Sequence, residues 1–404
     1  MRLGPWIAYF LFGLALGCDA SSSTPSAGSG GATSASGGSV SGGSATAGET
    51  SGAGMGGSAV TGGSGATGGM ATGGMTTSAG GGSGGSSGAS VSSLSGIPIP
   101  PVEGNVPPPT GAASTLKIVD WAGFKGAVSY TFDDTNSSQI SNFDALNGLG
   151  VRLTFYLQTN KTTELANDVW KKALAAGHEL GNHSHSHQQA PAEAAGAADV
   201  DQAQGILKEK FGVTAYTMAA PYGSAVYSTI AKTRFLINRG VSNGLVGPND
   251  ASDPFNLYCY IPPGTATAAD LNLQIDQARA AGKWRIVLVH GFIGGTDGAY
   301  EAVNVTEFTT SVEHSKSLKD MWIDSLVNVG SYWLAQRVIT AVTPTTSGSD
   351  KTWTWQMPEH FPPGKYLRVT TDGGTLKQGG VALPWDSHGY YEVALDAGAV
   401  TLSP

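Results

Sequence analysis

The chain has 404 residues, of which 59 are glycine and 13% are charged, and its formal net charge is −8. An acidic chain of this kind offers no basic patch, so nucleic acid is excluded as an expected partner. The glycine excess is confined to one region, which indicates a low-complexity segment beside a globular part.

The first 18 residues have the pattern of an export signal. Arg2 precedes an apolar run that is too short for a comfortable membrane span, so residues 1–18 are expected to be a signal peptide. The residues before Cys18 resemble a bacterial lipoprotein cleavage box, although Ala15 stands where such boxes prefer leucine. That resemblance implies lipidation of Cys18, and an ordinary secretory signal is the alternative. We therefore expect an exported protein of the cell envelope or the extracellular space, attached to a membrane only through this lipid.

Residues 19–113 are expected to be a linker. Up to about residue 95 they are almost entirely Gly, Ser, Ala and Thr, and two proline-rich stretches follow. Such a composition cannot bury enough apolar surface to order itself, and it would span on the order of 50 Å. The prolines should stiffen its end.

Periodicity predicts an α/β domain over residues 114–342. The expected strands cover 127–132, 151–157, 179–182, 215–220 and 284–290. The expected helices cover 139–149, 164–176, 192–211, 268–281 and 320–337. Buried strands that alternate with helices predict a parallel α/β sheet or barrel. The run 255–261 also resembles a buried strand, and its Cys259 is expected to be a small core residue without a disulfide.

Residues 343–404 predict a small all-β module. Short alternating strands are expected at 352–355, 366–371 and 390–395. Four aromatic residues of this module could form a platform for sugar rings or its core, and the core is the favoured interpretation: Trp353, Trp355, Trp385 and Tyr390.

Polar groups follow four of the predicted strands: Asp133 and Asp134, the run His183-Ser-His-Ser-His187, Pro221-Tyr-Gly223, and His290. Chemistry in α/β folds gathers at the carboxyl ends of the strands, so these groups are expected to form one site.

The histidine run is the leading candidate for a metal site. In a helix, His183 and His187 would share one face, whereas in an extended segment His185 would join them. A polar surface loop is the alternative. A carboxylate with two imidazoles leaves coordination positions open for hydrolysis. Of the adjacent carboxylates Asp133 and Asp134, one could bind the ion while the other takes a proton from water, although a helix cap or turn is the alternative for the pair.

These motifs resemble those of the polysaccharide deacetylases, carbohydrate esterase family 4, over residues 114–339. The resemblance implies a distorted (β/α) barrel with one divalent ion, usually zinc, with cobalt and nickel as alternatives. It implies Asp134, His183 and His187 as metal ligands. It further implies Asp133 as the general base and His290 as the general acid.

The resemblance also assigns substrate contacts. The backbone N–H of Tyr222, between Pro221 and Gly223, would stabilise the oxyanion, and Leu288 would line the pocket for the acetyl methyl group. The Ser184 hydroxyl could fix the loop. His185 fits no family role, and we expect it beside the site or at its solvent-facing rim.

Two departures from the family pattern affect the catalytic pair. The arginine that normally holds the catalytic aspartate is replaced by Ala219, which leaves the partner of Asp133 open, with Arg239 as a candidate. The fourth motif, which tunes the catalytic histidine, has only an echo in residues 250–255. We therefore expect His290 to depend on another carboxylate.

The sequence thus predicts a monomeric, metal-dependent hydrolase that removes acetyl groups from a polysaccharide. N-acetylglucosamine polymers such as chitin or peptidoglycan rank ahead of acetylated xylan. The alternative from another class is a degenerate barrel that binds carbohydrate, and a hydrolase of the same fold that attacks other amides is a third.

Overall fold

The structure is a computed structural model and describes residues 94–404. The predicted signal peptide, the lipidation of Cys18 and most of the linker lie outside the described residues. Within the described part, none of the helices combines the length and the apolar character needed to cross a bilayer.

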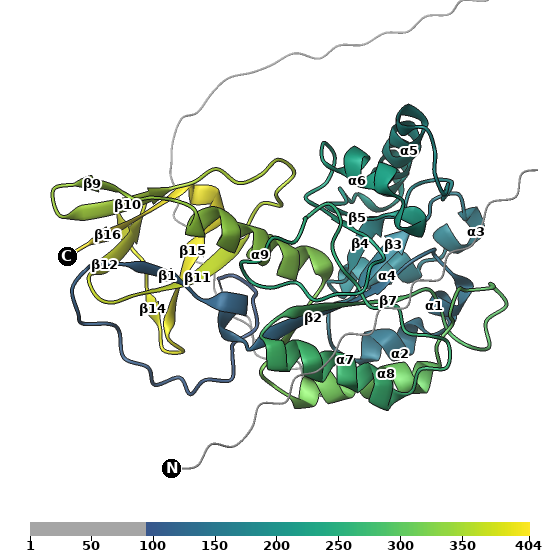
Figure 1. Ribbon diagram of the computed structural model, residues 1–404, viewed down its shortest axis with the longest axis horizontal. Coiled ribbons are helices and arrows are strands. Elements are labelled where there is room, and N and C mark those ends of the chain that lie inside the picture. Colours follow the sequence, from purple (N-terminus) through teal and green to yellow (C-terminus); the bar gives the residue numbers. More distant parts are fainter. Residues whose placement is uncertain (1–93) are drawn as a thin grey trace, which may run out of the picture. The chain divides into compact units, whose positions relative to one another are not determined.

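A parallel sheet of seven strands forms the centre of the α/β part, in the order β6-β5-β4-β3-β2-β7, with β8 also paired to β2 (Figure 1). Its strands are β2 (Gly126–Phe132), β3 (Thr154–Leu157), β4 (Glu179–Asn182), β5 (Thr217–Ala219), β6 (Ile237–Arg239), β7 (Trp284–Val289) and β8 (Met321–Ile323). The start of β2 pairs with β8, whereas its end pairs with β3. The five strands predicted for this part are all present.

An irregular segment closes this sheet into a barrel. Leu257 bridges to Arg239 at the end of β6, and Tyr260 bridges to Val287 of β7, both in parallel orientation. The backbone bonds Leu257 N–H to Asn238 O and Tyr260 N–H to Ile286 O join the same two edges. The segment 255–261 is therefore extended as expected, but it forms isolated bridges in place of a strand, and only Leu257 and Cys259 in it are buried. The expected distorted (β/α) barrel is confirmed.

Helices cover the outside of the barrel (Figure 1). They are α1 (Ser137–Ser141), α2 (Phe143–Gly148), α3 (Thr162–Leu165), α4 (Val169–Ala175), α5 (Glu193–Phe211), α6 (Ala225–Ala231), α7 (Ala268–Ala281), α8 (Val305–Ser317) and α9 (Leu326–Thr340). Side chains alternate along each strand, so β7 contributes Val287 and Val289 to one hydrophobic cluster and Trp284, Ile286 and Leu288 to another. The first cluster packs under the helices other than α9. The second, which we call the inner cluster, also contains the buried residues of α9 and of the C-terminal strands.

The helix expected over 320–337 is wrong in its first turn. Residues 321–323 form β8, because β2 has an open edge there, and the helix α9 begins only at Leu326. The N–H of Leu326 bonds to Thr154 Oγ1, and the N–H of Val327 bonds to Glu179 Oε2. The start of α9 is thereby attached to the starts of β3 and β4.

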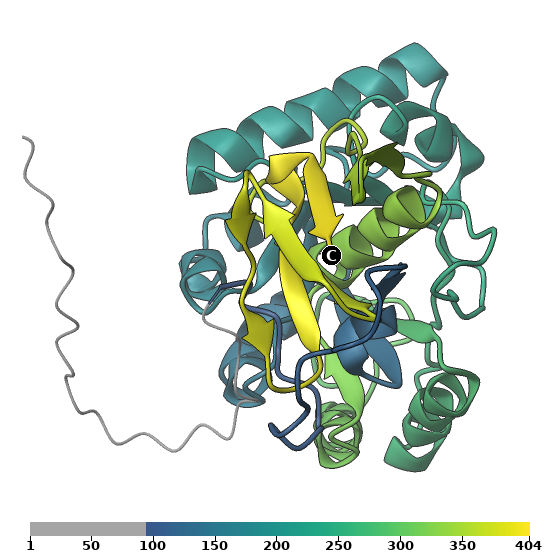
Figure 2. The same ribbon diagram turned by 90° about the vertical axis from the view of Figure 1, so that its left-hand side faces the viewer.

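The C-terminal residues form two antiparallel sheets, in the orders β1-β11-β15-β14 and β13-β12-β16-β10-β9 (Figure 2). Their strands are β1 (Leu116–Ile118), β9 (Thr345–Ser347), β10 (Asp350–Thr354), β11 (Tyr366–Thr371), β12 (Thr375–Gln378), β13 (Val381–Ala382), β14 (Trp385–Asp386), β15 (Tyr390–Ala394) and β16 (Ala399–Ser403). Strand β1 precedes the barrel in the sequence, but it pairs with β11, which follows the barrel. Trp353, Trp355 and Tyr390 are buried, which supports the core interpretation over an exposed aromatic platform.

The end of the expected linker is bonded to this β module. Arg368 of β11 is fully buried, and its guanidinium donates to the carbonyl oxygens of Ile97, Pro98 and Ala122 at 2.8–3.1 Å. The carboxylate of Glu392 compensates its charge at 3.2 Å. The proline-rich segment is therefore part of the folded structure from about residue 94, because a buried cation takes up its carbonyl groups.

Candidate active site

The four polar groups predicted to meet all follow strands of the barrel sheet, and the turn Pro221–Gly223 follows β5. Asp133 and Asp134 follow β2, His183 follows β4, and His290 follows β7. Asp133, the predicted base, and His290, the predicted acid, follow the adjacent strands β2 and β7. The bond from the Asp133 N–H to Val289 O joins the ends of these two strands. The parallel register of the sheet thus brings together side chains that are up to 157 residues apart in the sequence.

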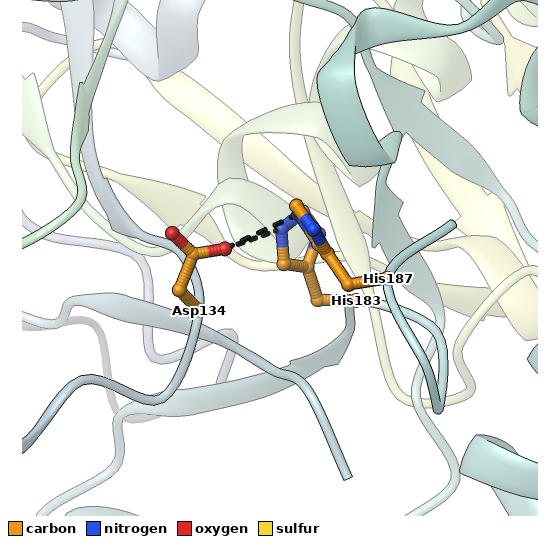
Figure 3. A group of neighbouring side chains, drawn as sticks. All are labelled: Asp134, His183 and His187. Atoms are coloured by element: carbon orange, nitrogen blue, oxygen red, sulfur yellow. Dashed lines mark hydrogen bonds and ion pairs between the residues drawn. The ribbon is translucent and has the colours of Figure 1, made fainter. Parts of the chain in front are cut away.

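The three predicted metal ligands converge on one point (Figure 3). Asp134 Oδ1 lies 3.1 Å from His183 Nε2 and 3.3 Å from His187 Nε2. One ligand atom from each of the three residues lies within 4.8 Å of the others. A carboxylate oxygen and two imidazole nitrogens at this spacing form a set that suits a zinc-like divalent ion.

The charges around these atoms also suit a cation. His183 Nδ1 donates to the carbonyl of Ala219 at 2.9 Å, so the neutral ring directs the lone pair of Nε2 towards Asp134. Burial disfavours the charged ring, but the carboxylates of Asp133 and Asp134 outweigh it and raise the pKa of His183. Burial and the neighbouring His183 lower the pKa of His187 to about 4. The site therefore favours positive charge at its centre, while His187 remains a neutral ligand near pH 7.

The carboxylate of Asp134 is ready to bind a cation. Burial alone would favour its neutral form, but the hydrogen bond and charge of His183, with smaller contributions from His290 and His187, lower its pKa. A ligand that is already ionised releases no proton when the ion binds.

The histidine run is neither a helix nor a strand. It turns through left-handed backbone at Ser184, where φ is 62°, and at His187, where φ is 54°. The Ser184 hydroxyl accepts the N–H of His187 at 3.0 Å, which confirms that it fixes the loop. His185 Nδ1 hydrogen-bonds to Thr159 Oγ1 at 2.9 Å, so the extended alternative, with His185 as a ligand, is wrong.

A carboxylate that the sequence reading missed holds this loop. Asp199, buried on α5, accepts the N–H of His185 at 3.0 Å, and it accepts the N–H and the hydroxyl of Ser186 at 3.1 and 2.6 Å. These bonds fix two of the three residues between the candidate ligands His183 and His187. The only sequence signal was an acidic residue on the helix side that otherwise carries Gly196, Val200, Ala203 and Leu207.

Arg239 is the partner of Asp133. Its guanidinium Nη2 donates to Asp133 Oδ2, and both side chains are almost completely buried. Arg239 lies directly beside Ala219 in the register of β5 and β6. The guanidinium that the resemblance led us to expect at position 219 is thus supplied by Arg239, the residue paired with Ala219 on the next strand. Asp133 Oδ1 has no hydrogen-bond partner among the described residues, so this oxygen is free to accept a proton.

The backbone of His290 is fixed, but its ring has no carboxylate partner. Gln139 Nε2 donates to the carbonyl oxygens of both His290 and Asp133, which ties the two predicted catalytic residues to α1. His290 Nδ1 is buried without a partner among the described residues, so the expected second carboxylate is absent there. Burial lowers the pKa of His290, with partial opposition from Asp133 and Asp134.

The echo of the fourth motif has a different role. The carboxylate of Asp250 accepts the backbone N–H groups of Gly247 and Ser252, and Asp253 accepts the N–H of Phe255. Both carboxylates therefore stabilise turns of their own segment, as aspartate often does in loops.

The turn Pro221–Gly223 presents Tyr222 to the site. Tyr222 has a φ of 54°, and its ring lies 4.6 Å from that of His187. Gly223 has a φ of 65°, and a Cβ there would overlap Val241, so this turn requires glycine. Leu288 packs in the inner cluster and is not among the residues lining the cavity described below; the apolar residues that line the cavity include Ala220, Val241 and Ile261.

Strained backbone is concentrated at this site. Five non-glycine residues with left-handed φ lie at these strand ends: Asp134, Thr135, Ser184, His187 and Tyr222. Each such conformation costs about 1–3 kcal/mol, and it persists only where surrounding contacts enforce it. The strained residues therefore include two of the three candidate metal ligands, Asp134 and His187.

The predicted residues surround a cavity of about 590 Å³. We call it the metal-site cavity; its lining includes Asp133, Asp134, His183, His187, Tyr222 and His290. The sequence reading missed Asn136, Lys161, Asp297 and Tyr300, which also line it. They lie outside the four motifs, so the sequence pattern gave no indication that they belong to the site.

Residues 123–237 match the family described as polysaccharide deacetylase. The match spans β2 to β6 and contains the three metal ligands and Asp133. Over these residues the chain is similar to the polysaccharide deacetylases. The resemblance seen in its motifs is confirmed, and the family is one of hydrolases.

Solved structures similar to the chain carry related descriptions. A protein of Mycobacterium smegmatis described as a polysaccharide deacetylase is 16% identical, with a TM-score of 0.41, over 60% of this chain and 98% of that one. A family 4 carbohydrate esterase of Streptomyces lividans is 19% identical, with a TM-score of 0.36, over 50% and 92%. The peptidoglycan deacetylase PdaC of Bacillus subtilis is 19% identical, with a TM-score of 0.34, over 50% and 89%. No curated protein matches the chain.

Proposed function

We propose that the chain is a metal-dependent deacetylase that hydrolyses N-acetyl groups of N-acetylglucosamine polymers, such as chitin or peptidoglycan, and releases acetate. The observation that carries the proposal is the meeting of a cation-binding triad, an arginine-held carboxylate and a buried histidine at one cavity. A divalent ion held by Asp134, His183 and His187 would act as a Lewis acid on the acetyl carbonyl.

The chain's own residues then divide the proton transfers. Asp133, with Oδ1 free and Oδ2 held by Arg239, takes a proton from the water that attacks the carbonyl carbon. His290, which lines the same cavity, donates a proton in its protonated form to the leaving amine nitrogen. The N–H of Tyr222 is the proposed donor to the oxyanion, presented by the strained turn.

The test is acetate release by the full chain from N-acetylglucosamine oligomers, peptidoglycan and acetylated xylan, before and after chelation and after addition of zinc, cobalt or nickel. Release that chelation abolishes and one of the ions restores supports the proposal. The absence of release from every polymer, by protein shown to bind one ion, overturns it.

An Asp133→Asn variant separates an enzyme from a degenerate carbohydrate-binding barrel. The triad is untouched by this substitution, so the variant should bind the ion and lose turnover. If wild-type protein and variant bind oligosaccharide equally and neither releases acetate, the binding protein is the correct interpretation.

We also propose that the protein is a monomer held at the cell envelope by a lipid on Cys18. The support is the apolar run before Cys18 and the glycine-rich stretch after it. Incorporation of labelled fatty acid into the wild type, and its loss in Cys18→Ser, tests the anchor. Light scattering of residues 94–404 tests the oligomeric state.

A further inference from the structure

Tyr300 presents an exposed aromatic ring at the metal-site cavity. Its side chain is 63% exposed although it lines the cavity. The ring centroid lies 5.3 Å from that of His290, and the two rings are nearly perpendicular, at 89°. The phenol therefore lies beside the proposed acid.

The loop that carries Tyr300 is firmly held. Asp297 accepts the N–H of Ser138 at 2.6 Å and the N–H of Ala299 at 3.3 Å, which attaches the loop to the start of α1. The two strands of the loop are joined by bonds from Val303 N–H to Gly291 O and from Ile293 N–H to Val303 O, at 3.1 and 2.9 Å. The ring is thus kept in place without being buried.

The contacts of Tyr300 leave the face of its ring available for binding. No described residue hydrogen-bonds to its hydroxyl, and its one ring contact is His290. An exposed aromatic ring on a braced loop beside a cavity indicates a binding surface more than a contribution to the fold.

A second exposed ring lies beside the metal ligands. Tyr222 is 57% exposed and contacts His187, whereas Tyr300 contacts His290. The cavity therefore has one aromatic ring beside a metal ligand and another beside the proposed acid. Sugar rings present apolar C–H faces that stack on aromatic rings, so two such rings suit more than one sugar unit.

We propose that Tyr300 is a specificity-determining residue that stacks on the sugar unit next to the one that is deacetylated. The site then prefers oligosaccharides to isolated acetylated groups. This inference rests on the proposed deacetylase function.

The experiment compares zinc-loaded wild type, Tyr300→Ala, Tyr300→Phe and Ile293→Ala. Ile293 lies on the same loop and is 59% exposed, but it is not among the residues that line the cavity. For each protein, kcat/KM is measured on N-acetylglucosamine oligomers of increasing length and on a small aryl acetate. The preference for oligomer is the ratio of the two values.

Loss of the stacked ring should lower this preference about tenfold in Tyr300→Ala, mainly through KM, with the largest effect on the longer oligomers. Tyr300→Phe and Ile293→Ala should keep the preference. An unchanged preference in Tyr300→Ala, or an equal loss in Tyr300→Phe or in Ile293→Ala, overturns the inference.

Failure of the proposed function is recognised separately, because wild-type protein would then release no acetate. In that case, calorimetric titration with the longest oligomer decides the role of Tyr300. Binding that weakens about tenfold in Tyr300→Ala supports the stacking role, and equal binding or no binding by the wild type refutes it.

Discussion

Replacement of Arg239 by methionine should destabilise the protein and abolish turnover. Arg239 is fully buried, and its guanidinium donates to Asp133 and to the carbonyl of Gly240 at 2.8 Å. It also lies 5.6 Å from the centre of the Tyr156 ring. Removing one partner of a buried ion pair leaves an uncompensated charge, which costs about 3–5 kcal/mol. Urea unfolding of chelated protein measures this cost without a contribution from a bound ion.

A double substitution tests the reasoning behind this magnitude. Arg239→Met combined with Asp133→Asn removes both charges, so it should recover about 2 kcal/mol or more of the lost stability while remaining inactive. Acetate release by Arg239→Met should be reduced at least about a hundredfold, since the proposed base loses its orientation. Wild-type stability in Arg239→Met, or additive losses in the double variant, would refute the view that Arg239 serves as the counter-ion of Asp133.

Three further predictions follow from other contacts. Asp199→Ala should weaken zinc affinity about tenfold in competition with a chelator, because the loop between His183 and His187 loses its acceptor. The matched control Asp201→Ala, on the exposed side of α5, should not weaken it, and equal affinities in all three proteins would show that Asp199 does not position the ligands. Burial lowers the pKa of His178 to about 4, so the unfolded chain binds the proton first and stability should fall by up to about 3 kcal/mol between pH 6.5 and pH 4. His178→Asn, which keeps an acceptor for the Leu153 N–H, should flatten that part of the profile in urea unfolding, and an unchanged profile contradicts this. Zinc at about a thousandfold excess over its dissociation constant should raise stability by about 4 kcal/mol in the wild type and much less in Asp134→Asn, and an equal gain in both would place the ion elsewhere.

The barrel could be predicted because its buried strands leave a strong pattern. The run 284–289 is apolar throughout, since both of its faces are covered, and polar side chains follow its end at His290. Strand β8 was missed for the opposite reason. Its three residues are held by pairing with β2, a long-range contact that a short segment cannot encode in its own composition.

Residue type and spacing predicted a metal site at the histidine run, and the family resemblance supplied the ligand set with Asp134, but the conformation of the run was not predictable. Neither a helical nor an extended reading anticipates left-handed backbone at Ser184 and His187, because that backbone is enforced by Asp199 and by the Ser184 hydroxyl. Tyr300 could not be placed for a similar reason. Long-range bonds to α1, from the Ser138 N–H to Asp297 and from the Phe292 N–H to Ser138 Oγ, bring its loop to the cavity.

The position of Arg239 has a consequence for how proteins of this family are counted. A survey that scores each motif residue by residue would classify the chain as inactive from Ala219 alone. The guanidinium is nevertheless present beside the carboxylate, supplied by the register neighbour of Ala219 on the next strand. A classification of active and inactive members would therefore be more accurate if it compared the side chains that lie beside the catalytic aspartate in the structure. Residue identity at one aligned position is not sufficient.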